Sequence, residues 1–399
     1  IVIKAGDEHK TLDTLTHVWQ ELQRQGATRH SLLVNLGGGM VTDLGGFAAS
    51  TFKRGLHLIN IPTTLLAMVD ASVGGKTGIN FGGLKNELGV FRNASAVILD
   101  TTFLGTLDQE NILSGYAEML KHGLIAPVQH GSTQMAPVQH GSEQIATVLH
   151  GSTRYNEEEN REQPCQTEAM IATVQHGSTR FSEEENREEP WKTVAKPEEE
   201  NREKPWKTVA KPEEENREEP WKTVAIKPGK TEAMIDELLR FDVEHPDLKV
   251  LGRMVADSVQ VKQRVVLEDP LEQGLRKALN LGHTVGHAFE SLALQRKPVL
   301  HGYAVAWGLV CELYLSVIKT GFPTDRMRQV VRFILEHYGR MPITCDDYPT
   351  LLQLMTHDKK NIAGKINFTL LSDVGQPVLN QTATKEEIEE ALDFYREGN

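Results

Sequence analysis

This chain lacks the features that mark secreted, membrane-spanning or nucleic-acid-binding proteins. Its three cysteines are odd in number and far apart, which argues against a disulfide framework. No run of about eighteen apolar residues predicts a transmembrane helix, and no signal peptide is recognisable. Acidic residues outnumber basic ones 55 to 43, so no excess of positive charge faces nucleic-acid phosphates. We therefore expect a cytoplasmic protein without nucleic-acid or membrane partners, although the charge balance still allows a local basic pocket for a small anion.

Strands and helices alternate in the first part of the chain. Residues 11–25 carry an amphipathic helical pattern, residues 31–36 and 56–61 are short apolar runs, and a helical segment begins near Val41. Such alternation predicts a parallel sheet covered by helices on both faces. The chain starts with Ile1 in what reads as the middle of a domain, so we expect a fragment.

The later sequence is mainly helical in pattern, and 399 residues are enough for two domains. Apolar residues recur with a helical period in residues 248–266 and 325–338. A strand is expected at 366–371 and a closing helix at 385–396.

Short repeats fill residues 126–230. Val-Gln-His-Gly-Ser recurs near His130, His140 and His176, and Glu-Glu-Glu-Asn-Arg-Glu begins at 183, 198 and 213, a spacing of fifteen. A unit with one Trp and little else apolar can bury little surface. This favours a mobile or marginally helical insertion without chemistry of its own over a solenoid, although the histidines would allow loose metal binding.

Two histidines four residues apart are the strongest chemical signal. His283 and His287 lie on one face of a helix, because four residues are slightly more than one turn. A third, His301, begins the next apolar helical run, and Glu118 lies in an earlier one. One carboxylate and two or three imidazoles predict a zinc-type site with an open position. Ordinary helix histidines are the alternative.

A glycine-rich turn at residues 37–39 follows the first apolar run. Glycines let the backbone approach a pyrophosphate, and the next helix directs its N–H groups at it, so the turn predicts a dinucleotide site. Tight strand-to-helix turns use glycines for other reasons as well. Asp43, one turn into the helix, either reaches a ligand or simply favours the helix start.

Basic and amide side chains surround further glycines. Residues 74–77 read Gly-Gly-Lys-Thr but lack the glycine spacing of a P-loop, so we reject a nucleotide triphosphatase. Lys76 lies near Lys85 and Asn86, a set suited to holding phosphate or carboxylate, although solvated lysines are the usual alternative. Other candidates stand beside the metal residues: Lys121, Lys262, Arg276 and Asn280. Together they suit a small, polyanionic, polyhydroxylated ligand.

These strings together resemble the 3-dehydroquinate synthases of the sugar-phosphate cyclase family, over about residues 5–124 and 236–375. The resemblance implies an α/β fold with a Rossmann-like parallel-sheet NAD domain and a mainly α-helical metal-binding domain. The NAD domain would span residues 1–110, incomplete at its start. The helical metal and substrate domain would span 111–399, interrupted at about 126–230. The matching strings are 37–43, 54–55, 62–66, 70–86, 115–121, 276–290 and 301–302.

The resemblance implies a carbon–oxygen lyase of the shikimate pathway, and hence of aromatic amino acid biosynthesis. Its substrate would be the keto-acid phosphate DAHP, and its products 3-dehydroquinate and phosphate. NAD would remove hydride from C5, phosphate would leave by elimination, NADH would return the hydride, and an aldol step would close the ring. The cofactors would be NAD and zinc or cobalt, and the assembly a homodimer.

The resemblance also assigns roles to residues. The metal ligands would be Glu118, His283 and His301. The phosphate would be surrounded by Lys76, Asn86, Asn280, His287 and Lys359. The substrate carboxylate would be bound by Lys262 and Arg276, with Lys121 beside the metal, and Arg54 would reach into the partner's site. The cofactor side would be formed by Asp7, Lys10, Gly38, Gly39, Asp43, Thr63, Thr64, Asp70, Lys76 and Lys85.

The chain departs from the family pattern in three places. About sixty residues would precede Ile1 in relatives, Asp7 stands where the family has Glu, and the repeat block follows Lys121 closely. The alternatives are another sugar-phosphate cyclase, a glycerol-dehydrogenase-like oxidoreductase that would release NADH, or an inactive fragment or scaffold.

Overall fold

The computed structural model describes residues 1–82, 84–127, 144–148, 169–174, 233–356 and 366–398. Residues 1–176 and 230–399 form one unit, and the second unit, 177–229, lies outside the described residues.

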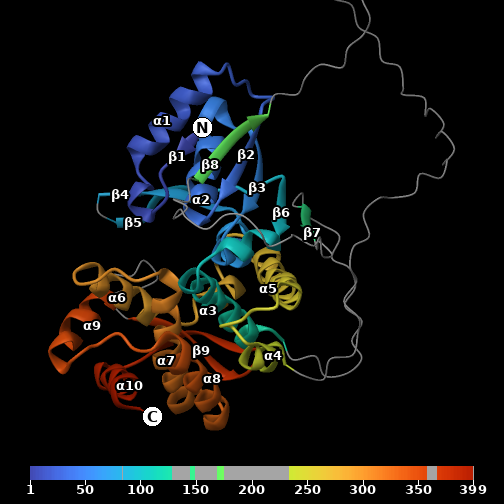
Figure 1. The fold of residues 1–399 in the computed structure, drawn as a ribbon. Coiled ribbons are helices and arrows are strands. Elements are labelled where there is room, and N and C mark those ends of the chain that lie inside the picture. The colour runs from blue at the N-terminus through green and yellow to red at the C-terminus, as the bar shows by residue number, and fades with distance from the viewer. Residues whose placement is uncertain (83, 128–143, 149–168, 175–232, 357–365, 399) are drawn as a thin grey trace, which may run out of the picture. The chain divides into compact units, whose positions relative to one another are not determined.

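A six-stranded sheet forms the core of the first part of the chain (Figure 1). Four strands, β2, β3, β6 and β7, run parallel, and β8 is antiparallel to both β2 and β1. Inward and outward residues alternate along β2 and β3, as expected for pleated strands. The order across the sheet is β1 (Val2–Ile3), β8 (Ala169–Val174), β2 (Leu32–Gly37), β3 (His57–Pro62), β6 (Ala96–Asp100) and β7 (Gln144–Val148).

Strands β7 and β8 come from the repeat-rich segment, for which the sequence favoured a mobile or marginally helical insertion. The helical interpretation is wrong for these two stretches. Both are rich in Ile, Val and Thr, which favour strands. Strand β8 pairs with β2, and strand β7 pairs with β6. The histidine and tryptophan repeats lie outside the described residues.

Helices α1 (Leu12–Arg24) and α2 (Gly39–Thr51) accompany the sheet, with short helical turns η1 (Asp7–His9) and η2 (Phe52–Arg54). Helix α1 begins where Thr11 accepts a hydrogen bond from the Thr14 amide, and it buries Leu15, Val18 and Leu22 at helical spacing. Both helices confirm the predicted alternation. After β3 come η3 (Ala67–Ala71) and the antiparallel hairpin β4 (Lys76–Phe81) and β5 (Leu84–Phe91), which the sequence patterns did not reveal.

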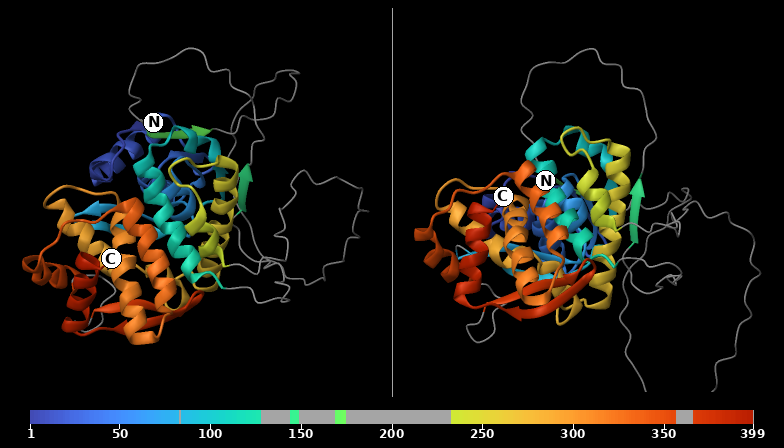
Figure 2. Two further views of the ribbon diagram at one scale, coloured as in Figure 1. Left: turned by 60° about the horizontal axis from the view of Figure 1, so that its bottom comes forward. Right: turned by 90° about the horizontal axis from the view of Figure 1, so that it is seen from below.

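The second part of the chain is mainly helical, with one two-stranded sheet, β9–β10. The helices predicted near 248–266, 325–338 and 385–396 and the strand near 366–371 are confirmed. Figure 2 shows α3 and α5 side by side. The elements are η4 (Thr101–Thr106), α3 (Gln109–Ile125), α4 (Met234–Arg240), α5 (Leu248–Glu268), η5 (Leu275–Asn280), α6 (His283–Leu294), α7 (His301–Thr320), α8 (Thr324–Tyr338), η6 (Cys345–Asp347), α9 (Tyr348–Thr356), β9 (Asn367–Asp373), β10 (Gln376–Thr382) and α10 (Lys385–Glu397).

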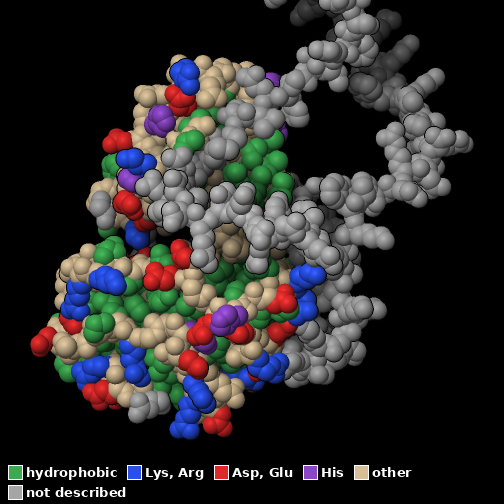
Figure 3. Space-filling model, in the orientation of Figure 1, with side chains coloured by type: hydrophobic (Ala, Val, Ile, Leu, Met, Phe, Trp, Pro, Cys, Tyr) green, Lys and Arg blue, Asp and Glu red, His purple; other side chains and the backbone are tan. Residues whose placement is uncertain are grey.

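Helix α7 is the central helix of this part and packs against α3, α6, α8 and α10. By length and composition it is the one helix of the described residues that passes for a membrane span, yet 72% of the tested window is buried in the protein. A core helix passes the same test. On the face drawn in Figure 3, acidic and basic side chains of the described residues are interspersed rather than gathered by sign.

Candidate active site

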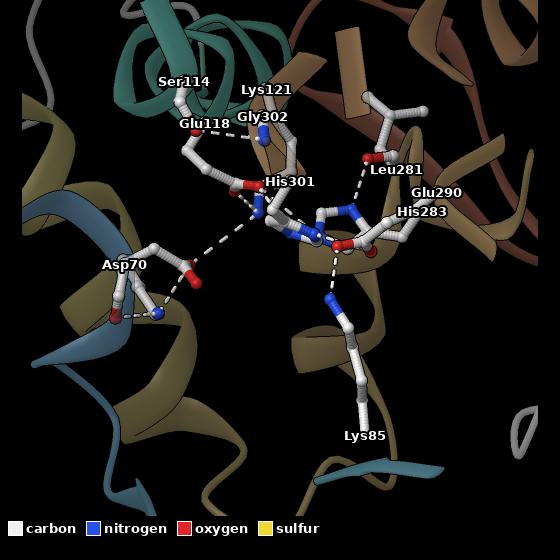
Figure 4. Close-up of polar contacts among 11 residues, drawn as sticks. Asp70, Lys85, Ser114, Glu118, Lys121, Leu281, His283, Glu290, His301 and Gly302 are labelled. Atoms are coloured by element: carbon white, nitrogen blue, oxygen red, sulfur yellow. Dashed lines mark hydrogen bonds and ion pairs between the residues drawn. The ribbon is translucent and has the colours of Figure 1, made fainter. Parts of the chain in front are cut away.

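Three helices bring together the side chains expected to bind metal. Glu118 comes from α3, His283 from the start of α6 and His301 from the start of α7. Nε2 of His283 lies 3.4 Å from Oε1 of Glu118, and Nε2 of His301 lies 3.6 Å from the same oxygen (Figure 4). Residues separated by up to 183 positions, from Glu118 to His301, therefore meet at one oxygen atom.

The donor set fits a divalent cation. Oε1 of Glu118 is buried and accepts no hydrogen bond from the part of the chain that the structure describes, which is costly unless a nearby positive charge neutralises it. The Nδ1 atoms of the two histidines face other acceptors: Leu281 O at 3.1 Å for His283 and Glu290 Oε2 at 3.2 Å for His301. Such contacts fix the imidazole orientation and leave Nε2 directed at the shared carboxylate, as in protein zinc sites.

Electrostatics also favour positive charge at this point. Burial by itself lowers the pKa of His301, but the carboxylates of Glu290 and Glu118 outweigh it and raise that pKa to about 10. Burial likewise opposes ionisation of Glu118, while Lys121 and His301 hold the pKa of its carboxyl well below the usual range. The charges of these groups together therefore stabilise a cation among them.

Close helix contacts make this geometry available. A Cβ added at Gly302 would lie 1.9 Å from the Ser114 carbonyl oxygen, so only glycine lets α7 approach α3 at this point. The Gly302 amide donates to the Ser114 hydroxyl at 3.2 Å. Glycine next to His301 therefore places its imidazole against Glu118.

A buried carboxylate organises the start of α6. Gly282 precedes the helix and provides no side chain to satisfy its first amides. Glu312, fully buried on α7, accepts hydrogen bonds from the Gly282 amide at 2.6 Å and the Val285 amide at 3.1 Å. His283 lies between these two amides, so Glu312 fixes the backbone that carries it.

A second buried charge cluster adjoins the metal residues. Lys121 donates to Oε2 of Glu118, and its Nζ lies 3.9 Å from Oδ1 of Asp70. Lys262 donates to the same Asp70 oxygen at 2.6 Å. Burial opposes ionisation of Asp70, but Lys262 and Lys121 together hold the pKa of its carboxyl low. Two carboxylates and two ammonium groups thus balance one another where the sheet part meets the helices.

The basic side chains expected to bind substrate are held by carboxylates that the sequence did not single out for this purpose. Lys76 Nζ lies 2.5 Å from Oε2 of Glu272, whose other oxygen accepts from Asn280 at 2.9 Å. Lys85, on β5, donates to Glu290 at 2.8 Å and lies 3.2 Å from Asp7.

Two further expected residues also take definite positions. Arg276 is 2% exposed and donates to the carbonyls of Gly74 at 2.8 Å and Pro270 at 2.7 Å. The His287 ring lies 5.4 Å from that of His283 and 5.8 Å from that of His301, so by distance it belongs with the metal-ligand group.

The expected cofactor residues gather where parallel strands end. Gly37 pairs in register with Pro62, and the Thr63 amide donates to the Gly37 carbonyl at 3.0 Å. Helix α2 then starts after Gly38, where no side chain caps its amides. A Cβ at Gly38 would lie 3.1 Å from Thr64. The carboxyl edge of a parallel sheet, with bare helix amides, is the usual place for a dinucleotide phosphate.

Asn86 contacts a residue expected on the cofactor side. Its side chain accepts from Lys10, which also donates to Asp43, each at 2.5 Å. Burial raises the pKa of Asp43, and Lys10 opposes that rise. Arg54 is exposed at the end of η2. Lys359 lies outside the described residues.

Reasoning from the sequence missed several residues of this site. Glu272 and Glu312 are glutamates without a motif around them. Lys76, one partner of Glu272, is 196 positions away, and the amides that Glu312 accepts from are 30 and 27 positions away. His122 is fully buried on α3, and its Nδ1 lies 2.7 Å from the Ser258 hydroxyl. It directly follows Lys121, yet it was not singled out from the sequence. A glutamate in an otherwise apolar helix, as with Glu312, was the one signal that sequence reading had available.

Comparisons with known proteins identify the family to which this chain belongs. The family models described as "3-dehydroquinate synthase N-terminal" and "3-dehydroquinate synthase C-terminal" match residues 1–114 and 222–361, together more than half of the chain. A 3-dehydroquinate synthase of Parabacteroides distasonis is 43% identical over 398 residues, covering 100% of this chain and 83% of the relative. That of Pyrococcus furiosus is 32% identical, covering 96% and 81%.

Solved structures show the same fold. A 2-deoxy-scyllo-inosose synthase complexed with carbaglucose-6-phosphate, NAD+ and Co2+ has a TM-score of 0.64 at 19% identity, covering 99% of this chain and 81% of that one. A 2-epi-5-epi-valiolone synthase of Streptomyces hygroscopicus subsp. jinggangensis with NAD+ and Zn2+ bound also has a TM-score of 0.64, at 20% identity, covering 100% and 82%. The expected fold, a parallel-sheet domain followed by a helical domain, is confirmed. On the matched domains and the 43% identity, this chain belongs to the 3-dehydroquinate synthase family.

Proposed function

We propose that this chain is a 3-dehydroquinate synthase, which converts DAHP to 3-dehydroquinate and inorganic phosphate in the shikimate pathway. Family membership supports this reaction. The structural observation that carries it is the convergence of His283 and His301 on one buried oxygen of Glu118, which accepts no hydrogen bond from the described residues. The protein would be a lyase that works in the cytoplasm as a homodimer, with Arg54 reaching into the partner's site.

Glu118, His283 and His301 would hold a divalent cation, zinc or cobalt. The carboxyl edge of the sheet at residues 37–39 and Thr63 would hold NAD. The two structurally similar cyclases bind NAD+ with Co2+ or Zn2+, which supports both cofactors. When bound, the metal supplies a Lewis acid for a substrate hydroxyl, and NAD supplies a reversible hydride acceptor.

The chain's own side chains would bind and orient the substrate. Lys76 and Asn280 would take the phosphate, with His287 beside them. Arg276 and Lys262 would supply positive charge for the carboxylate. Arg276 is the better orienting group, because its guanidinium is already fixed by two carbonyls and its planar fork matches a carboxylate. Lys121 would keep Glu118 ionised, since its ammonium contacts the carboxylate that must bind the cation.

The test is phosphate release from DAHP by the purified chain with NAD and zinc or cobalt, with NADH followed in the same tube. Phosphate release without net NADH is expected, because the hydride is returned before product leaves. Accumulation of NADH would instead indicate an oxidoreductase, and no release would indicate an altered relative or an inactive chain. A sugar phosphate without a carboxylate, turned over in place of DAHP, would identify another cyclase.

A pair of variants ties activity to the site. His283→Ala is expected to weaken zinc binding by at least about a hundredfold and to abolish phosphate release. His245→Ala, whose exposed side chain faces Asp242, is the matched control and should match the unaltered protein. Full activity and full zinc content in His283→Ala would contradict the metal assignment.

A further inference from the structure

A single carboxylate holds two groups that the proposed function assigns to the substrate phosphate. One oxygen of Glu272 lies 2.5 Å from Nζ of Lys76, and the other accepts a hydrogen bond from Asn280 at 2.9 Å. Lys76 comes from β4 and Asn280 from η5, 204 positions later in the chain. Glu272 therefore bridges two elements at a point where an anion is expected to bind both.

The backbone presents Glu272 in a left-handed conformation. Its φ is +59°, which a non-glycine residue adopts at an energetic cost. Asp269 holds the turn in this shape, because its carboxylate accepts hydrogen bonds from the amides of Gln273 at 2.9 Å, Gly274 at 2.7 Å and Arg276 at 3.0 Å. The turn therefore keeps the Glu272 carboxylate directed at Lys76 and Asn280.

The contact is also open to exchange. The side chain of Lys76 is 54% exposed and that of Glu272 is 22% exposed. Ion pairs that water reaches are weak, so an incoming anion with a higher charge competes with them effectively. Glu272 carries one negative charge, whereas a phosphate monoester carries about two near neutral pH.

We infer that Glu272 is an internal anion that occupies the phosphate-binding groups Lys76 and Asn280 and is displaced by the phosphate of the substrate. This inference rests on the proposed function of those two residues. A dianionic phosphate displaces Glu272 effectively, whereas a singly charged carboxylate gains little by doing so. The same carboxylate returns to Lys76 when the product phosphate leaves.

The test uses the full chain with zinc and NAD, and inorganic phosphate as the probe, titrated by calorimetry. Glu272→Gln removes the competing charge and keeps the size of the side chain. It is expected to bind phosphate about fivefold more tightly, the equivalent of losing one exposed ion pair. Acetate, used as a singly charged probe of the same groups, should gain affinity as well, because it competes with the same carboxylate.

The matched control is Glu268→Gln, which makes the same change of charge at an exposed residue paired with Arg264 on α5. Unchanged or weaker phosphate binding by Glu272→Gln, or an equal gain in Glu268→Gln, would overturn the inference. Lys76→Met separates this result from the proposed function. If Lys76→Met weakens phosphate binding while Glu272→Gln has no effect, only the inference fails. If Lys76→Met has no effect either, the phosphate site itself is wrongly assigned.

Discussion

Glu312 provides the sharpest test of how this site is built. Its fully buried carboxylate accepts hydrogen bonds from the Gly282 and Val285 amides at the start of α6, where the N-cap residue Gly282 has no side chain to do so. Hydrogen bonds to a charged group contribute about 1.5–3 kcal/mol each. Glu312→Ala removes both bonds and leaves the two amides buried, so we expect the free energy of unfolding to fall by roughly 3–5 kcal/mol.

Glu312→Gln is the milder change, because one side-chain oxygen remains to accept a hydrogen bond. It should cost about 2–3 kcal/mol, since the amide nitrogen that replaces the other oxygen faces a backbone donor. Metal affinity should fall as well, by about ten- to a hundredfold, because His283 lies between the two capped amides. Equilibrium unfolding in urea measures the first quantity, and competition with a zinc chelator measures the second.

The exposed Glu336 of α8 provides the control for charge, as Glu336→Gln. If both Glu312 variants unfold within about 0.5 kcal/mol of the unaltered protein, the capping argument is refuted. If they lose stability and keep full zinc affinity, Glu312 supports the fold without positioning His283.

Three further perturbations follow from the same contacts. Gly302→Ala would place a Cβ 1.9 Å from the Ser114 carbonyl, so α3 and α7 must separate and zinc affinity should fall sharply in the chelator assay. Lys121→Met leaves the buried Glu118 carboxylate without its ammonium partner, so the free energy of unfolding of the metal-free protein in urea should fall by about 3–5 kcal/mol. A smaller loss with zinc bound would show that the cation replaces the lysine charge. An unchanged unfolding midpoint would refute the pairing of Lys121 with Glu118. Burial and the Lys121 charge lower the pKa of His122 to about 3, below its value of about 6.5 in the unfolded chain, so stability is lost as pH falls through that window. His122→Gln should flatten the pH dependence of urea unfolding between pH 7 and 4, and an unchanged slope would contradict it.

The candidate metal ligands could be proposed from the sequence because two of the histidines have a spacing that places them on one helix face. His283 and His287 share a helix face, and the helix forms where its pattern predicted. The glycine turn and α2 were also predictable from local sequence, because a short apolar strand is followed directly by glycines at which a helix can begin. The hairpin β4–β5 was not predictable in this way. Every residue of β5 is exposed, so the strand has no buried face to impose an alternating pattern.

The carboxylates that hold the substrate residues were beyond local reading for a different reason. Lys76 and Glu272 are 196 positions apart, and Lys85 and Glu290 are 205 apart. A single glutamate in a polar turn belongs to no periodic pattern, so the sequence does not predict which residue it contacts. Only the folded chain determines which charges meet, because Coulomb attraction depends on distance in space and not along the sequence.

One repeated string separates the two contributions. Ala-Met-Ile occurs at residues 169–171, within β8, and again at 233–235, where it begins α4. By itself the sequence determined which side chains were available: the imidazoles and carboxylate for a cation, the glycines at the strand end, and the lysines for anions. The tertiary structure decided whether the same three residues complete a sheet or open a helix. The three residues have the same local preference in both copies, so their surroundings decide. The first copy is followed by Ala-Thr-Val and pairs with β2, whereas the second is followed by Asp-Glu-Leu-Leu and buries Ile235 beside α3.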